Sequence, residues 1–127
     1  MKEKLMKRIV DQYINSYNKF DADGMTKNLH KDIVFKNIAD DKVTLELKGK
    51  IAFKSQIEQA FGLFKRREMK ILEQKFGDDI VENRVDFKGV LAVDIPDGPK
   101  KYDLIKLQYN TTFKFKDGKI ISIEDIN

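Results

Sequence analysis

Three charged side chains on two predicted strands have the types and spacing of an acid–base site. Arg84 and Asp86 are two residues apart, so their side chains leave the same face of a strand predicted at residues 79–95. Asp125 lies near the end of the last predicted strand and shares its parity with two isoleucines that should face the core. One arginine can hold two carboxylates by bidentate hydrogen bonds, and two neighbouring carboxylates in a dry site do not titrate alike. One could therefore act as general acid and the other as general base.

The same three residues also fit a surface role. Most charged side chains on a strand lie on a solvated face, and spacing alone favours that interpretation. His30 is the only histidine, and we expect it at the surface or at a helix end because it follows a short predicted helix. With no cysteine and with scattered carboxylates, the sequence predicts no disulfide, no metal site and no bound cofactor.

Length and composition predict a single globular domain. The chain has 127 residues, of which 41% are hydrophobic, and this is enough to bury one core without disulfides. The first residues contain no apolar segment of the signal-peptide type, and no stretch has the roughly 20 apolar residues of a membrane span. We therefore expect a cytoplasmic protein without a membrane partner. The net charge is +4, but basic and acidic residues are interspersed, which argues against a nucleic-acid partner.

Hydrophobic periodicity predicts helices first and a strand meander afterwards. Apolar residues at three- and four-residue spacing indicate helices at about 3–19 and 51–65, with a short helix at 24–29. The basic run at 65–67 would then end the second long helix, where the helix dipole favours cations. Alternating patterns predict strands at about 33–38, 43–47, 69–76, 79–95, 102–116 and 119–125.

This order predicts an α+β fold in which helices cover one face of a mainly antiparallel sheet. In the strand at 102–116, the odd-numbered residues are mostly apolar and should face the helices. A strongly curved sheet covered by two long helices tends not to close completely, which leaves a pocket at its mouth. The candidates for the pocket wall, each with ordinary core packing as its alternative, are Tyr13, Phe35, Phe64, Leu107, Tyr109, Thr111 and Ile123.

The sequence resembles the NTF2-like (SnoaL-like) superfamily over nearly its whole length. The resemblance is carried by the order of the elements, by Asp21-Ala-Asp-Gly24 after the first helix, and by Phe113-Lys-Phe-Lys-Asp-Gly-Lys-Ile-Ile121 near the end. It implies one cone-shaped domain, residues 1–127, with a curved mixed sheet wrapped by N-terminal helices around a pocket. It also implies a homodimer. The candidate interface is the apolar side of the 79–95 strand, with Val81, Val85 and Phe87.

Within this superfamily, the sequence is most similar to the limonene-epoxide-hydrolase-like branch. The matching residues are Arg84 and Asp86 on one strand, Asp125 on the last strand, and Asn37 on the first strand. The resemblance implies that Asp125 draws a proton from a water molecule held by Asn37. Asp86 would protonate the oxygen of a small apolar epoxide, and Arg84 would orient both carboxylates. Phe35 departs from the pattern of this branch, which has a tyrosine there.

Two other functions fit the same sequence. The domain could be a non-catalytic module that binds a small apolar ligand or a partner protein. A structure with Arg84 and Asp86 on the solvent face, away from Asp125, would favour that alternative. The domain could also be an enzyme of the polyketide-cyclase or steroid-isomerase type. Tyr13 matches a tyrosine of the steroid isomerases, but Asn37 and Thr111 stand where their base and acid would be.

Overall fold

A computed structural model describes all 127 residues of the chain. Its helices and strands follow one another in the order that hydrophobic periodicity predicts. None of the helices combines the length and the apolarity that crossing a bilayer requires. The elements are α1 (Glu3–Asn18), α2 (Ala22–Thr26), β1 (Leu29–Ala39), β2 (Lys42–Lys48), α3 (Lys50–Ala60), the 3-10 turn η1 (Phe61–Leu63), β3 (Phe64–Gly77), β4 (Ile80–Leu91), β5 (Leu104–Lys116) and β6 (Lys119–Ile126).

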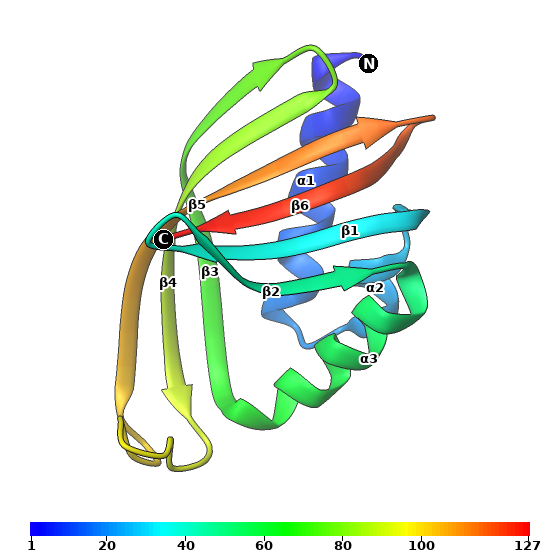
Figure 1. Cartoon of the computed structure of the whole chain (residues 1–127). Helices are drawn as coiled ribbons and strands as arrows, with labels where there is room; N and C mark the ends of the chain where they lie inside the picture. Colours follow the sequence, from blue (N-terminus) through cyan, green and yellow to red (C-terminus); the bar gives the residue numbers. More distant parts are fainter.

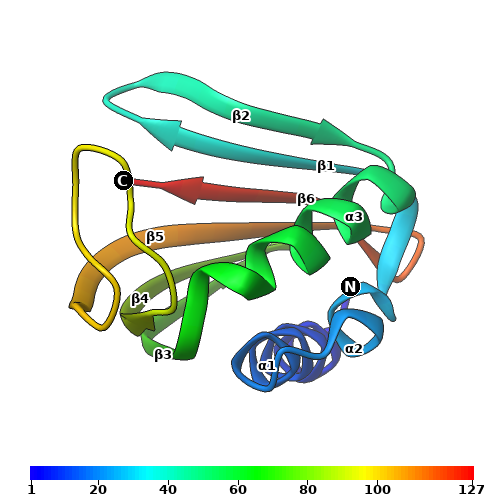
Figure 2. The same ribbon diagram turned by 90° about the horizontal axis from the view of Figure 1, so that it is seen from below.

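The six strands form one sheet in the order β2-β1-β6-β5-β4-β3. β1 runs parallel to β6 and every other neighbouring pair is antiparallel, so the sheet is mixed. The sheet bends strongly (Figure 1), and seen from below it forms an arch with α1, α2 and α3 on its concave side (Figure 2). This is the α+β architecture that the sequence predicts, a curved sheet with the N-terminal helices on one face.

The amphipathic pattern of α1 decides how this helix docks on the sheet. Met6, Val10 and Tyr13 are buried on the side that faces the strands. Burying side chains of this size contributes about 1.5–3 kcal/mol each. The ring of Tyr13 meets the ring of Phe113 on β5 edge-on, with 5.3 Å between the ring centroids. Because residues four apart share a helix face, Tyr17 points toward the same concave surface.

Tight turns set the register of the strands. Asp117 and Gly118, between β5 and β6, have positive φ angles of 54° and 76°. Positive φ at both central residues is the geometry of a two-residue hairpin turn that matches the twist of the strands. The Asp-Gly hairpin predicted from the sequence is confirmed. Its register places Thr111 opposite Asp125 in the β5–β6 ladder.

The second long helix is shorter than predicted, and this changes the surroundings of the basic segment. α3 ends at Ala60, and β3 begins at Phe64 after the turn η1. The basic residues 65–67 therefore lie in a strand, and the prediction that they end a helix is wrong. Successive side chains of a strand point to opposite faces. Arg66 is accordingly exposed, whereas Arg67 is turned inward and is only 8% exposed.

The apolar side of β4 faces the helices. Val81, Val85 and Phe87 are buried in the main hydrophobic core. The prediction that these residues form a dimer interface is wrong. β4 is an interior strand of a sheet with one covered face, and its apolar side fills that face.

Candidate functional site

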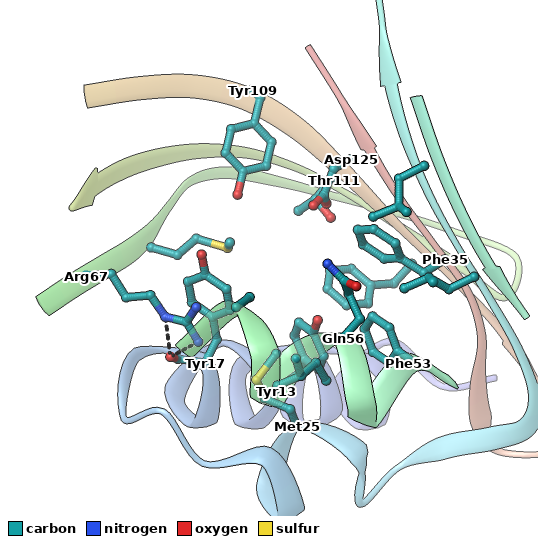
Figure 3. Close-up of a pocket in the computed structure, with 16 residues that line it drawn as sticks. Tyr13, Tyr17, Met25, Phe35, Phe53, Gln56, Arg67, Tyr109, Thr111 and Asp125 are labelled. Carbon is teal, nitrogen blue, oxygen red and sulfur yellow. Dashed lines mark hydrogen bonds between the residues drawn. The ribbon is translucent and has the colours of Figure 1, made fainter. Parts of the chain in front are cut away.

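A cavity lies between the concave face of the sheet and the helices (Figure 3). Its volume is about 190 Å³, and 12 of its 16 lining residues are hydrophobic. An apolar cavity of about 150 Å³ is large enough for benzene, so a small ring compound matches this one in size. The lining residues are Tyr13 and Tyr17 (α1), Met25 (α2), Phe35 (β1), Leu45 and Leu47 (β2), Phe53, Gln56, Ile57 and Ala60 (α3), Arg67 and Met69 (β3), Tyr109, Thr111 and Phe113 (β5), and Asp125 (β6).

The periodicity of each element aims these side chains at the cavity. Tyr13 and Tyr17 are four residues apart on α1 and therefore lie one above the other on the same helix face. Tyr109, Thr111 and Phe113 alternate along β5 with exposed or outward-facing residues. The alternation that builds the core thus also places polar atoms of tyrosine and threonine in the wall of the cavity.

Asp125 supplies the only carboxyl group in this wall. No lysine, arginine or histidine forms an ion pair with it. Burial raises the pKa of Asp125 to about 6, and hydrogen bonding with the Thr111 side chain acts in the opposite direction. Near neutral pH the carboxyl group is therefore mostly ionised, yet its pKa is close enough for it to take up and return a proton.

Three tyrosine hydroxyls share the cavity with Asp125. The hydroxyls of Tyr13, Tyr17 and Tyr109 point toward its interior (Figure 3). Burial is the largest cause that raises the pKa of each hydroxyl, and the negative charge of Asp125 raises it further. The hydroxyls consequently stay protonated at neutral pH and can donate hydrogen bonds to a bound molecule.

Arg67 lies on the other side of the cavity from Asp125 (Figure 3). Its Nε and Nη2 atoms donate hydrogen bonds to the backbone carbonyl oxygen of Tyr17, at 3.0 and 2.9 Å. Burial lowers the pKa of Arg67, but a guanidinium group remains charged at neutral pH. One cation and one carboxyl group therefore face the same largely apolar space, with tyrosine hydroxyls between them.

Comparison with known proteins identifies the family. A family model described as a SnoaL-like domain matches residues 10–123, which is most of the chain. The chain belongs to this SnoaL-like family. None of the curated proteins matches the sequence.

Solved structures share the fold of this SnoaL-like domain at low sequence identity. A candidate polyketide cyclase from Xanthomonas campestris pv. campestris has a TM-score of 0.82 and 18% identity, with 98% of this chain and 90% of that chain covered. An LEH-like epoxide hydrolase from M. tuberculosis has a TM-score of 0.77 and 16% identity, with 97% and 82% covered. A hypothetical protein with a ketosteroid isomerase-like fold from Catenulispora acidiphila has a TM-score of 0.74 and 10% identity, with 92% and 82% covered. At these identities the similarity establishes the fold and not the reaction.

The structure of the SnoaL-like domain brings five of the eleven predicted site residues together in the cavity wall. Tyr13, Phe35, Tyr109 and Thr111 line the cavity with Asp125. These five residues lie on α1, β1, β5 and β6, and the curvature of the sheet brings their elements around one space.

Four other predicted residues lie nearby or in the core. Phe64, Leu107 and Asn37 line a second pocket that also includes Asp125. Asn37 is the partner of Asp125 in the parallel β1–β6 ladder, and its side-chain nitrogen donates a hydrogen bond to the Thr44 hydroxyl oxygen at 2.8 Å. Ile123 is 1% exposed and belongs to the core, and it lines neither pocket.

The predicted bridge of Asp86, Arg84 and Asp125 is not formed. Arg84 and Asp86 lie on the outer face of β4, where Arg84 Nη1 donates to Asn110 Oδ1 at 3.3 Å and Asp86 Oδ1 accepts from Gln108 Nε2 at 3.5 Å. Side chains alternate along a strand, so burial of the apolar side of β4 turns both charged groups away from the cavity.

Sequence reasoning missed three polar groups of the SnoaL-like site, namely Tyr17, Gln56 and Arg67. The spacing of Tyr17 from Tyr13 on α1 could have indicated its direction. Arg67 alternates with the buried Met69, a signal that the predicted helix end concealed. No group of three or more histidine, aspartate or glutamate side chains is arranged to hold a metal ion.

Proposed function

We propose that this protein binds a small, largely apolar molecule in the cavity and that Asp125 exchanges a proton with it. The observation that carries the proposal is a carboxyl group with a pKa of about 6 and no ion-pair partner in a largely apolar wall. A general base is most effective when its pKa lies near the working pH. A buried carboxyl group with a raised pKa and no ion-pair partner is typical of functional sites.

The reaction that these groups support best is proton abstraction from a carbon next to a carbonyl group. The Asp125 carboxylate takes the proton, and the electron pair of the C–H bond moves through the new C=C bond onto the carbonyl oxygen. The hydroxyls of Tyr13 or Tyr109 donate hydrogen bonds to this oxygen as its charge develops. The protonated Asp125 then returns the proton, to the same or to another atom. Isomerisation and ring closure both proceed through such a step, which agrees with the cyclase description of the Xanthomonas relative.

Epoxide hydrolysis is the second candidate. Asn37 and Asp125 are neighbours on β1 and β6 and line a common pocket, an arrangement suited to a water molecule between an amide and a base. The proton for the epoxide oxygen would then come from a tyrosine hydroxyl, because Asp86 lies on the outer face. The LEH-like relative from M. tuberculosis motivates this alternative. A binding module without turnover is the third candidate, since the outward position of Arg84 and Asp86 is what such a module predicts.

The decisive experiment measures hydrogen–deuterium exchange in D2O. A panel of one- and two-ring ketones and 1,3-diketones is incubated with the protein, and loss of the α-proton signal is followed by NMR. We expect acceleration for at least one compound and a loss of about 10²–10⁴-fold in the Asp125→Asn variant. Glu124→Gln is the matched control, because Glu124 is next on β6 and pairs with Lys114 at 3.8 Å.

The same samples separate the three candidates. Hydrolysis of styrene oxide or limonene oxide that depends on Asp125 and Asn37, without exchange of ketones, favours the epoxide hydrolase. Ligand binding without exchange or hydrolysis favours the binding module and contradicts proton transfer by Asp125.

A further inference from the structure

We propose that Arg67 is a substrate-anchoring residue and that the cavity takes a small apolar molecule bearing a carboxylate. This inference deepens the proposed function and rests on the same cavity. It assigns a role to a cation that proton transfer by Asp125 does not use. It also narrows the ligand from an apolar molecule to an apolar anion.

The guanidinium group of Arg67 is held in one orientation. Its central carbon lies 3.6 Å from the centroid of the Tyr17 ring, 4.5 Å from that of Phe20 and 5.3 Å from that of Phe61. Two hydrogen bonds to the carbonyl oxygen of Tyr17 fix the rotation of the guanidinium plane. An arginine that is already ordered loses little entropy when it binds an anion, which favours binding.

Part of the hydrogen-bonding capacity of Arg67 is unused. A guanidinium group has five N–H donors, and the two bonds to Tyr17 occupy one on Nε and one on Nη2. Nη1 makes no hydrogen bond with another residue of the cavity wall (Figure 3). Every fully buried side-chain nitrogen and oxygen in the protein has a partner, so Nη1, which has none, is open to the cavity or to solvent.

The charge of Arg67 is also uncompensated. No carboxylate lies within ion-pair distance of it, although the residue is only 8% exposed. Buried charges are normally paired because removing them from water is unfavourable. The aromatic rings compensate part of this penalty. A carboxylate of the ligand would supply the missing charge and accept the unused N–H groups in the bidentate geometry that arginine favours.

The position of Arg67 would orient the ligand relative to Asp125. The two residues lie on opposite sides of the cavity, with Tyr13 and Tyr17 on α1 and Tyr109 on β5 around the space between them (Figure 3). A carboxylate on Arg67 therefore directs the rest of the molecule toward the tyrosine hydroxyls and Asp125. A ring compound with a carboxylate at one end and a carbonyl group at the other fits this arrangement, with the carboxylate at Arg67 and the carbonyl group near the tyrosine hydroxyls and Asp125.

Capping of α1 is the structural alternative for Arg67. Tyr17 lies in the last turn of α1, and basic side chains stabilise such carbonyl groups. Capping alone predicts that Arg67 affects stability and leaves the choice of ligand unchanged. Anion binding predicts that it decides between charged and neutral ligands of the same shape.

Calorimetric titration of the native protein tests this difference without any substitution. The probes are benzoate, phenylacetate and 3-phenylpropanoate, each compared with its carboxamide at low ionic strength. Hydrogen bonds to charged groups predict that at least one carboxylate binds roughly 10- to 100-fold more tightly than its amide. Failure of every carboxylate to bind more tightly than its amide overturns the proposal.

Variants of Arg67 test whether this residue causes the preference for carboxylates over carboxamides. Arg67→Met should bring the carboxylate-to-amide ratio close to one, and Arg67→Lys should retain part of it. Arg66→Met is the matched control, because Arg66 is the exposed neighbour on β3. A preference that survives Arg67→Met contradicts the assignment. If Arg67→Met does not fold, the native ratio and the Arg67→Lys variant still decide.

Asp125→Asn separates this proposal from proton transfer. Carboxylate binding that persists in Asp125→Asn supports the anchoring role even if the protein exchanges no ketone protons. Conversely, exchange of neutral ketones without carboxylate preference supports proton transfer and rejects the anchor.

Discussion

The carboxyl group of Asp125 lies among aromatic and aliphatic side chains, and burial raises its pKa to about 6 from an ordinary value near 3.8. In the unfolded chain the group titrates at its ordinary value. Between about pH 4 and pH 6, the folded state therefore binds more protons than the unfolded state, and stability falls as the pH rises. Above about pH 6 the group is ionised in both states and the full penalty of burying its charge is present.

We predict that Asp125→Asn stabilises the fold at neutral pH and not in acid. A shift of about two pKa units corresponds to at most about 3 kcal/mol, because each unit is worth about 1.4 kcal/mol. Urea unfolding at about pH 4 and about pH 7.5 measures the difference between native and variant proteins. The free energy of unfolding of Asp125→Asn should exceed that of the native protein only at the higher pH. Glu124→Gln should show no comparable increase. Equal or lower stability of Asp125→Asn at neutral pH contradicts the raised pKa.

The raised pKa also predicts the pH dependence of proton abstraction. Asp125 acts as a base only when ionised, so the exchange rate of a responsive ketone should increase through about pH 6 and level off above it. Rates measured across this range, with the solvent-catalysed rate subtracted, give the apparent pKa. A midpoint near the ordinary aspartate value would show that the reacting group is not buried Asp125.

Residue parity explains which site residues the sequence could predict. Tyr109 alternates with outward-facing residues along β5, so its direction followed from the pattern. Asp125 shares the parity of the buried Ile123, but Ile121, which was also expected in the core, is not part of it. The parity of Arg84 and Asp86 was equally plain. Whether these two side chains face the cavity or the solvent could be decided only by knowing that helices cover one face of the sheet and that the apolar side of β4 fills that face. Arg67 was missed because its direction depends on where α3 ends.

At the scale of elements, α2 approaches α1 closely at Gly24. A Cβ atom at this position would overlap the hydroxyl of Ser16, which already accepts a hydrogen bond from Gln12. Ser16 is 6% exposed and has little room to move. The chain passes from α2 almost directly into β1, the strand that carries the cavity residue Phe35.

We predict that Gly24→Ala destabilises the protein by about 1–2 kcal/mol. Overpacking typically costs about 1–3 kcal/mol, and the better helix propensity of alanine offsets up to about 1 kcal/mol of this. Thermal unfolding measures the change. Gly62→Ala is the control, because nothing lies within 4 Å of a Cβ atom there, and it should be neutral or slightly stabilising. A Gly24→Ala variant as stable as the native protein would show that the two helices separate easily.

Long periodic elements were predictable, whereas several boundaries were not. The short helix α2 covers 22–26 and not 24–29, β1 begins at 29 and not at 33, and β4 ends at 91 and not at 95. α1 and β5 have patterns over 16 and 13 residues, and both lie within two residues of their predicted limits. The α3–β3 boundary falls in the segment Phe61–Phe64, whose apolar residues fit a helix as well as a strand. Packing of Phe64 against Phe87, with 5.3 Å between ring centroids, favours the strand, and the sequence alone does not reveal this contact.

At the scale of the whole molecule, the two faces of the sheet have different chemistry. The concave face holds the core and the cavity, and no helix covers the outer face (Figures 1 and 2). Along β4, the outer face presents Glu82, Arg84, Asp86 and Lys88, which alternate in sign. A two-fold dimer requires a surface that is complementary to itself, and a row of alternating charges meets this requirement.

We therefore propose that the homodimer implied by family resemblance forms through the outer face of β4, and we predict that it is sensitive to salt. Exposed ion pairs contribute about 0.2–1 kcal/mol each and are screened by ions, so the dimer fraction should fall between low and high ionic strength. Sedimentation velocity over a range of protein concentrations measures this fraction. Arg84→Glu should weaken the dimer because it places like charges opposite one another, whereas Lys4→Glu, the same charge change on α1, should not. A monomer at every concentration contradicts the proposal. A dimer that tolerates Arg84→Glu places the interface elsewhere and leaves the charged face of β4 to solvent.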